Sequence, residues 1–118
     1  MRDFRNYNIW KQAIDFATEI YKITRTFPKF ELYGLCDQLQ RAAVSISSNI
    51  AEGCSRDSEK DFAHFLEIAI GSAFEVESQL LIAKNLKYID EAIYNNLVSI
   101  LSQTERQIHS LINKIRMK

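Results

Sequence analysis

Apolar side chains recur every three or four positions along most of this chain, which is the spacing of one face of an α-helix. The pattern predicts helices over residues 9–26, 33–53 and 58–84, and a fourth helix from Asp90 nearly to residue 118. Strand-like alternation and internal repeats are absent from the sequence. Because the connections are short, we expect a single domain over residues 1–118, an all-α, antiparallel, up-down-up-down four-helix bundle.

Residues typical of helix ends stand at the predicted boundaries. Pro28 disfavours helix in the residue before it and should stop the first helix. Gly53 is suited to a left-handed cap at the end of the second helix. Ser58 and Asp90 are expected to accept hydrogen bonds at the starts of the third and fourth helices.

The second helix is built largely from small side chains between Arg41 and Gly53. Small side chains let neighbouring helix backbones approach closely, so this helix is expected to pack on more than one side. Glycine inside a helix costs about 1 kcal/mol relative to alanine. The Gly71-Ser72 pair in the third helix is therefore interpreted as a point of close approach to the second.

The apolar faces of the first and third helices are wider than a bundle core requires. On the third helix the apolar arc covers roughly half of the circumference, whereas about 100° or more is typical of a surface helix. The excess would leave an exposed apolar patch unless another subunit covers it. We therefore expect a homo-oligomer whose subunit contacts include Trp10, Ile14, Tyr21, Ser45, Ser48, Phe74 and Leu81.

Composition excludes several broad classes. The 118 residues carry 15 basic and 15 acidic side chains, so neither strong attraction to nucleic acid nor an acidic tail is indicated. The chain lacks an apolar run of about 20 residues and an N-terminal signal peptide, which predicts a cytoplasmic protein without a membrane partner. Cys36 and Cys54 lie five helical turns apart in one helix and are expected to be unpaired thiols.

Side chains suited to catalysis or metal binding are few and poorly spaced. A di-iron bundle needs two Glu-x-x-His motifs, but His64 precedes Glu67 in the reverse order, and Glu105 and His109 stand four apart. The sequence therefore predicts no metal, no cofactor and no catalytic residue. Arg41 is expected to form an ion pair with Glu75 or Glu77, and the alternative is that each charge is solvated.

The bundle topology gathers basic residues at one end. Both termini and the loop after the second helix should meet there, so this end would carry Arg2, Arg5, Arg56, Lys114, Arg116 and Lys118. Some of these cations would simply complement helix dipoles. Repeated in every subunit of a ring, they would form a multivalent rim that binds phosphates weakly and without sequence preference.

Several motifs resemble those of the bacterial 23S rRNA-intervening-sequence proteins. They are WKQA (10–13), FP (27–28), YGL (33–35), QLQRAAVSI (38–46), SNIAEG (48–53), FLEIAIGS (65–72) and EVESQL (75–80). The resemblance implies a four-helix bundle that assembles into a ring, most often a homopentamer. It also implies a similarity to the accessory proteins of diversity-generating retroelements, which bind nucleic acid. Two positions depart from the motif, since Ser47 replaces a common proline and Gln40 a usual arginine.

The sequence thus favours a non-catalytic, ring-like bundle protein that serves as a weak, sequence-independent RNA- or DNA-binding adaptor. The alternative is a ribonuclease or a metal-dependent bundle enzyme. Ribonucleases of the HEPN type share the architecture and use an arginine and a histidine four to six positions apart. Neither Arg56 with His64 nor Arg106 with His109 has that spacing.

Overall fold

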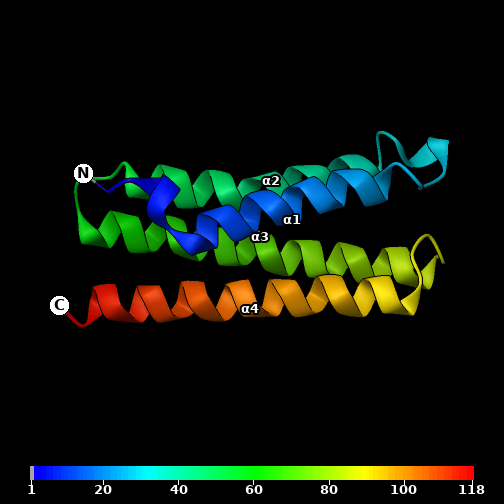
Figure 1. Cartoon of the computed structure of the whole chain (residues 1–118). Helices are drawn as coiled ribbons and strands as arrows, with labels where there is room; N and C mark the ends of the chain where they lie inside the picture. Colours follow the sequence, from blue (N-terminus) through cyan, green and yellow to red (C-terminus); the bar gives the residue numbers. More distant parts are fainter. Residues whose placement is uncertain (1) are drawn as a thin grey trace.

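A computed structural model describes residues 2–118 as a bundle of four antiparallel α-helices, 47 × 23 × 19 Å in extent (Figure 1). The helices are α1 (Asn8–Thr24), α2 (Leu35–Cys54), α3 (Glu59–Asn85) and α4 (Glu91–Arg116), and two short 3-10 helices are η1 (Phe4–Asn6) and η2 (Lys29–Glu31). Residues 2–118 contain no strand. The predicted fold class is confirmed.

Helix boundaries follow the capping residues closely. The Ser58 hydroxyl accepts a hydrogen bond from the Asp61 amide at 3.0 Å, and an Asp90 carboxylate oxygen accepts one from the Ile93 amide at 2.8 Å. Each bond satisfies an amide that has no partner inside its own helix. Both predicted caps are confirmed.

The core runs the length of the bundle. Each helix contributes large side chains with almost no exposed surface, among them Phe16, Ile20, Leu39, Ile46, Ile50, Phe62, Leu66, Leu80, Leu97, Leu101 and Ile108. Full burial of one such side chain stabilises the fold by about 1.5–3 kcal/mol. No helix within residues 2–118 is long and apolar enough to cross a membrane.

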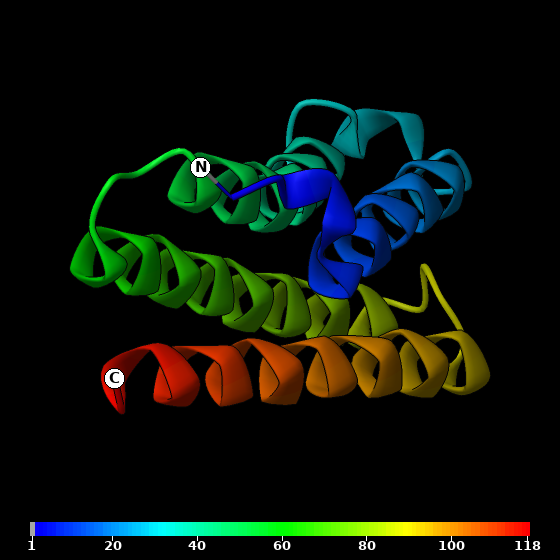
Figure 2. The same ribbon diagram turned by 60° about the vertical axis from the view of Figure 1, so that its left-hand side comes forward.

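The four helices pack unequally. α3 packs extensively against both α2 and α4, whereas α1 rests mainly on α2 and touches α4 much less (Figure 2). One polar contact marks the boundary between α1 and α4, where the Thr104 hydroxyl donates to the Gln12 side-chain oxygen at 3.3 Å. The bundle is therefore organised around the α2–α3 pair.

Gly53 does not cap α2, contrary to the prediction. The helix continues to Cys54, no glycine has a positive φ, and Gly53 is buried against α3. A Cβ at this position would lie 2.9 Å from the Phe65 Cβ and 3.1 Å from the Phe62 Cδ1. The glycine is therefore required by the close approach of two helices rather than by backbone conformation.

Gly71 is not a packing glycine, so its interpretation from the sequence is wrong. It is exposed, and a Cβ there would meet no heavy atom within 4 Å. Its neighbour Ser72 makes the contact with α2 instead, because the Ser72 and Ser45 hydroxyls are hydrogen-bonded at 2.8 Å. A step of one residue turns a helix by about 100°, which separates the two roles.

The predicted ion pair of Arg41 with Glu75 or Glu77 of α3 is absent from residues 2–118, so that prediction is wrong. The Arg41 side chain is 80% exposed, and its Nε donates to the Asp37 carboxylate one turn earlier in α2, at 3.0 Å. Arg41 therefore lies on the outer side of α2. Such an exposed pair contributes little to stability.

Cys36 and Cys54 are free thiols, as predicted, and both are buried. The Cys36 thiol donates a hydrogen bond to the Thr24 carbonyl oxygen at 3.5 Å. Burial raises the pKa of both thiols, so that each is held in its neutral form.

Candidate interaction surfaces

Exposed apolar side chains line the outer surface of the α1–α2 pair. Ile14 and Tyr21 lie across α1 from Gln12, the residue that faces α4, and Tyr21 is 43% exposed. On α2, the Gln40 amide donates to the Thr24 hydroxyl of α1 at 3.0 Å, and the exposed Val44 follows one turn later. We call Ile14, Tyr21 and Val44 the α1–α2 face.

A second apolar set lies on the outer surface of the α3–α4 pair. The Arg116 guanidinium of α4 donates to both oxygens of Glu67 in α3, at 2.7 and 3.3 Å. Phe74 and Leu81 follow Glu67 at steps of seven residues, so they lie on the same side of α3. Phe74 is 53% exposed and Leu81 is 42% exposed. We call these two residues the α3–α4 face.

The two faces lie on different sides of the bundle, since α1 and α2 form one layer and α3 and α4 the other (Figures 1 and 2). Of the predicted contact residues, Ile14, Tyr21, Ser48, Phe74 and Leu81 are exposed. The other two have partners inside the subunit, where the Trp10 ring packs edge-on against Phe4 and Ser45 bonds to Ser72. Val44 was not among the predicted contacts, although it is an apolar residue beside the polar positions of the second helix, namely Arg41, Ser45, Ser48 and Glu52.

The six predicted phosphate-binding cations do gather at one end of the bundle, where both termini and the α2–α3 loop meet (Figure 1). Five of them form ion pairs with carboxylates, namely Arg2 and Lys118 with Glu59, Arg5 with Asp3, Arg56 with Glu52 and Arg116 with Glu67. Lys114 alone among the six has no such partner within residues 2–118. A phosphate would therefore compete with carboxylates already in place.

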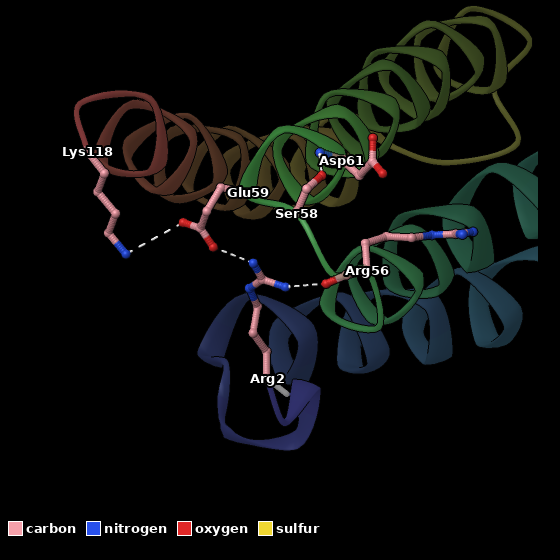
Figure 3. A network of polar contacts seen from close by, with 6 residues as sticks. All are labelled: Arg2, Arg56, Ser58, Glu59, Asp61 and Lys118. Atoms are coloured by element: carbon pink, nitrogen blue, oxygen red, sulfur yellow. Dashed lines mark hydrogen bonds and ion pairs between the residues drawn. The ribbon is translucent and has the colours of Figure 1, made fainter.

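Arg2 has a structural position at this end (Figure 3). Its guanidinium pairs with Glu59, donates to the Arg56 carbonyl oxygen at 2.7 Å and lies 4.3 Å above the centre of the Phe62 ring. Its side chain is only 19% exposed. Arg2 thus ties the N-terminal segment to the α2–α3 loop and the start of α3.

The Arg2 contact should be visible as a shifted titration of Glu59. The hydrogen bond from Arg2, with the nearby charge of Lys118, lowers the pKa of the Glu59 carboxyl below its usual value. A lowered pKa means that the contact stabilises the fold above the pKa of the unfolded carboxyl and is lost as the pH falls through the folded pKa. We expect Arg2→Ala to raise the pKa of Glu59 in an NMR titration of carboxyl groups.

Arg116→Ala is the matched control for this titration, because Arg116 lowers the pKa of Glu67 in the same way. It should raise the pKa of Glu67 and leave that of Glu59 in place. An unchanged Glu59 titration in Arg2→Ala would show that the Arg2 contact does not exist in solution.

At the opposite end, the two loops of the bundle are joined. The Tyr88 hydroxyl of the α3–α4 loop donates to the Glu31 carboxylate of the α1–α2 loop at 2.9 Å, and the Tyr88 ring lies 5.2 Å from that of Phe27. The neighbouring Phe30 and Tyr33 are among the most exposed large side chains of the chain. This end was not anticipated from the sequence as an exposed aromatic surface.

The histidines and carboxylates considered for chemistry are dispersed. His64 and His109 are both exposed, on α3 and α4. Within residues 2–118 no group of three or more His, Cys, Asp or Glu side chains is placed to hold a metal ion.

A family model places the chain among known proteins. The model for the 23S rRNA-intervening sequence protein matches residues 5–110. The chain belongs to this family. The resemblance predicted from its motifs is confirmed.

A solved structure shares the family's fold. It is the crystal structure of a protein with unknown function from the S23 ribosomal protein family of Bacteroides thetaiotaomicron. The two chains are 25% identical and superpose with a TM-score of 0.79, over 88% of this chain and 97% of the other. The chain matches no curated protein.

Both departures from the family motif have a place in the packing. Gln40 is half-buried and donates to Thr24 of α1, as described above. Ser47 is buried, and its hydroxyl donates to the Val44 carbonyl oxygen at 3.0 Å. A proline at position 47 would lack the amide that an interior helical residue donates.

Proposed function

We propose that the protein is a non-catalytic, self-assembling bundle protein. In the assembly, the α1–α2 face of one subunit packs against the α3–α4 face of the next. The observation that carries this proposal is the presence of two exposed apolar sets on different sides of one subunit. A contact between unlike faces is heterologous, and heterologous contacts close into rings when the rotation between subunits allows it.

The energetics favour a closed ring over an isolated pair. Burying the exposed part of a side chain such as Phe74 or Tyr21 contributes on the order of 1 kcal/mol. Association costs an estimated 4–15 kcal/mol of lost translational and rotational freedom. In a closed ring every subunit uses both faces, whereas in a pair half of the apolar surface stays in water. The resemblance noted from the sequence supports five subunits.

Light scattering coupled to size-exclusion chromatography tests this proposal. The wild-type protein should elute at a defined multiple of its 13.7 kDa chain mass, with five as the expected number. Phe74→Asp and Tyr21→Asp each place a charge within one face and should yield monomers. Met117→Asp is the control, since Met117 is exposed but lies outside both faces. Circular dichroism should show that every variant keeps its helical content.

A stable wild-type monomer at micromolar concentration would overturn the proposal. So would a Phe74→Asp protein that assembles like the wild type.

Nucleic-acid binding at the end that carries Lys114 stays a prediction. Five of the six cations there have carboxylate partners, which supports weak, salt-sensitive attraction rather than tight binding. A ring would repeat this end in each subunit and thereby raise the effective affinity for a long polyanion. The adaptor role therefore depends on assembly.

A further inference from the structure

Two carboxylates on the outer side of the α3–α4 pair have no cationic partner within residues 2–118. They are Glu77 of α3 and Glu105 of α4. The Oε2 atom of Glu105 is buried without a hydrogen bond. Burial and the nearby charge of Glu77 raise the pKa of Glu105, and the neighbouring cation Arg106, which forms no ion pair with it, opposes this shift only in part. A buried polar atom without a partner is costly, so this position is incomplete in the isolated subunit.

These carboxylates lie beside the α3–α4 face. Glu77 lies three residues after Phe74 and four before Leu81, so all three occupy neighbouring positions on one side of α3. A partner that covers Phe74 and Leu81 would therefore also cover Glu77 and reach Glu105.

An opposite charge stands beside the α1–α2 face. Arg25 follows Tyr21 by four residues, is exposed and forms no ion pair within residues 2–118. It therefore stands beside the apolar part of that face, at the C-terminal end of α1.

Arg25 and Glu77 both lie in the half of the bundle that is remote from the two termini. α1 and α3 run in the same direction, away from the end where the termini lie (Figure 1). Arg25 directly follows the last residue of α1, and Glu77 begins the final third of α3. Both charges are therefore found toward the same end of the bundle.

We propose that Arg25 of one copy of the chain forms an ion pair with Glu77 and Glu105 of the next copy. This inference rests on the proposed assembly and specifies its polarity. A guanidinium presents five donors and can satisfy two carboxylates at once. Two α3–α4 faces brought together would instead oppose four carboxylates, which disfavours a two-fold dimer and leaves the head-to-tail contact.

Charge reversal at Arg25 tests the pair. Arg25→Glu should raise the concentration at which the assembly dissociates by about tenfold or more, because a carboxylate then faces two others. In the Glu77→Gln, Glu105→Gln background the same change should have little effect, since the repulsion is gone. Lys60→Glu is the matched control, because Lys60 is also an exposed cation without an ion pair in residues 2–118 but lies near the start of α3. Dissociation is measured by light scattering over a dilution series.

The outcomes separate this inference from the proposed function. Suppose that Phe74→Asp abolishes assembly but Arg25→Glu does not weaken it. The proposed ion pair is then wrong and the assembly stands. The same conclusion follows if Arg25→Glu weakens assembly equally in the wild-type and the Glu77→Gln, Glu105→Gln backgrounds. If the wild-type protein is monomeric, both are wrong.

Discussion

Gly53→Ala is expected to lower the free energy of unfolding by about 1–3 kcal/mol, although alanine is the better helix former. The added Cβ would lie 2.9 Å from the Phe65 Cβ and 3.3 Å from the Phe62 carbonyl oxygen. These atoms belong to the start of α3 and cannot move aside as the end of a flexible side chain can. The α2–α3 contact must therefore open. Urea unfolding at one fixed protein concentration measures the effect.

Gly71→Ala is the matched control, with the opposite expected sign. It should raise the free energy of unfolding by about 0.5–1 kcal/mol, because the new methyl group meets open space while the helix gains a better residue. Equal losses at the two positions would contradict the packing described for α2 and α3.

Leu66→Ala is expected to cost about 2–5 kcal/mol of unfolding free energy. Leu66 has no exposed surface and lies in the part of α3 that packs into the core. Its removal leaves a cavity that rigid neighbouring helices cannot fill. Ile68→Ala is the comparison, since Ile68 lies two residues later on the same helix and is exposed. We expect it to cost less than about 1 kcal/mol.

The difference between these two variants should appear as a shift of the urea midpoint without a change in slope. Similar midpoints for Leu66→Ala and Ile68→Ala would mean that the side of α3 assigned to the core is wrong.

The fold could be predicted because its signals are local. The 3.6-residue periodicity and the polar caps Ser58 and Asp90 act within one helix or one turn, so a sequence contains them directly. The gathering of the basic residues at one end followed from topology alone. That Cys36 and Cys54 stay unpaired was predictable in the same way, from their separation of five turns in one helix.

The errors concern which neighbour a side chain meets. Gly53 was taken for a cap because it ends the helical pattern, and Gly71 for a packing position because it lies inside a helix. Neither signal shows which atoms the neighbouring helix brings to that position. Arg41 was assigned a partner on α3, but a rotation of α2 about its axis turns it outward to Asp37. In the wide apolar arc of α3, Ile70 is buried and Phe74 is exposed. Which part of that arc faces the core depends in the same way on how α3 is rotated about its own axis.

The burial of the two thiols has a practical consequence for testing the proposed assembly. The thiolate is the nucleophile that attacks thiol reagents, and both Cys36 and Cys54 are shielded and held neutral. A cysteine introduced at an exposed position outside the predicted subunit contacts, such as Ser110, would therefore react selectively with a maleimide dye while the native cysteines stay in place. Fluorescence energy transfer between labelled copies could then follow subunit exchange in real time.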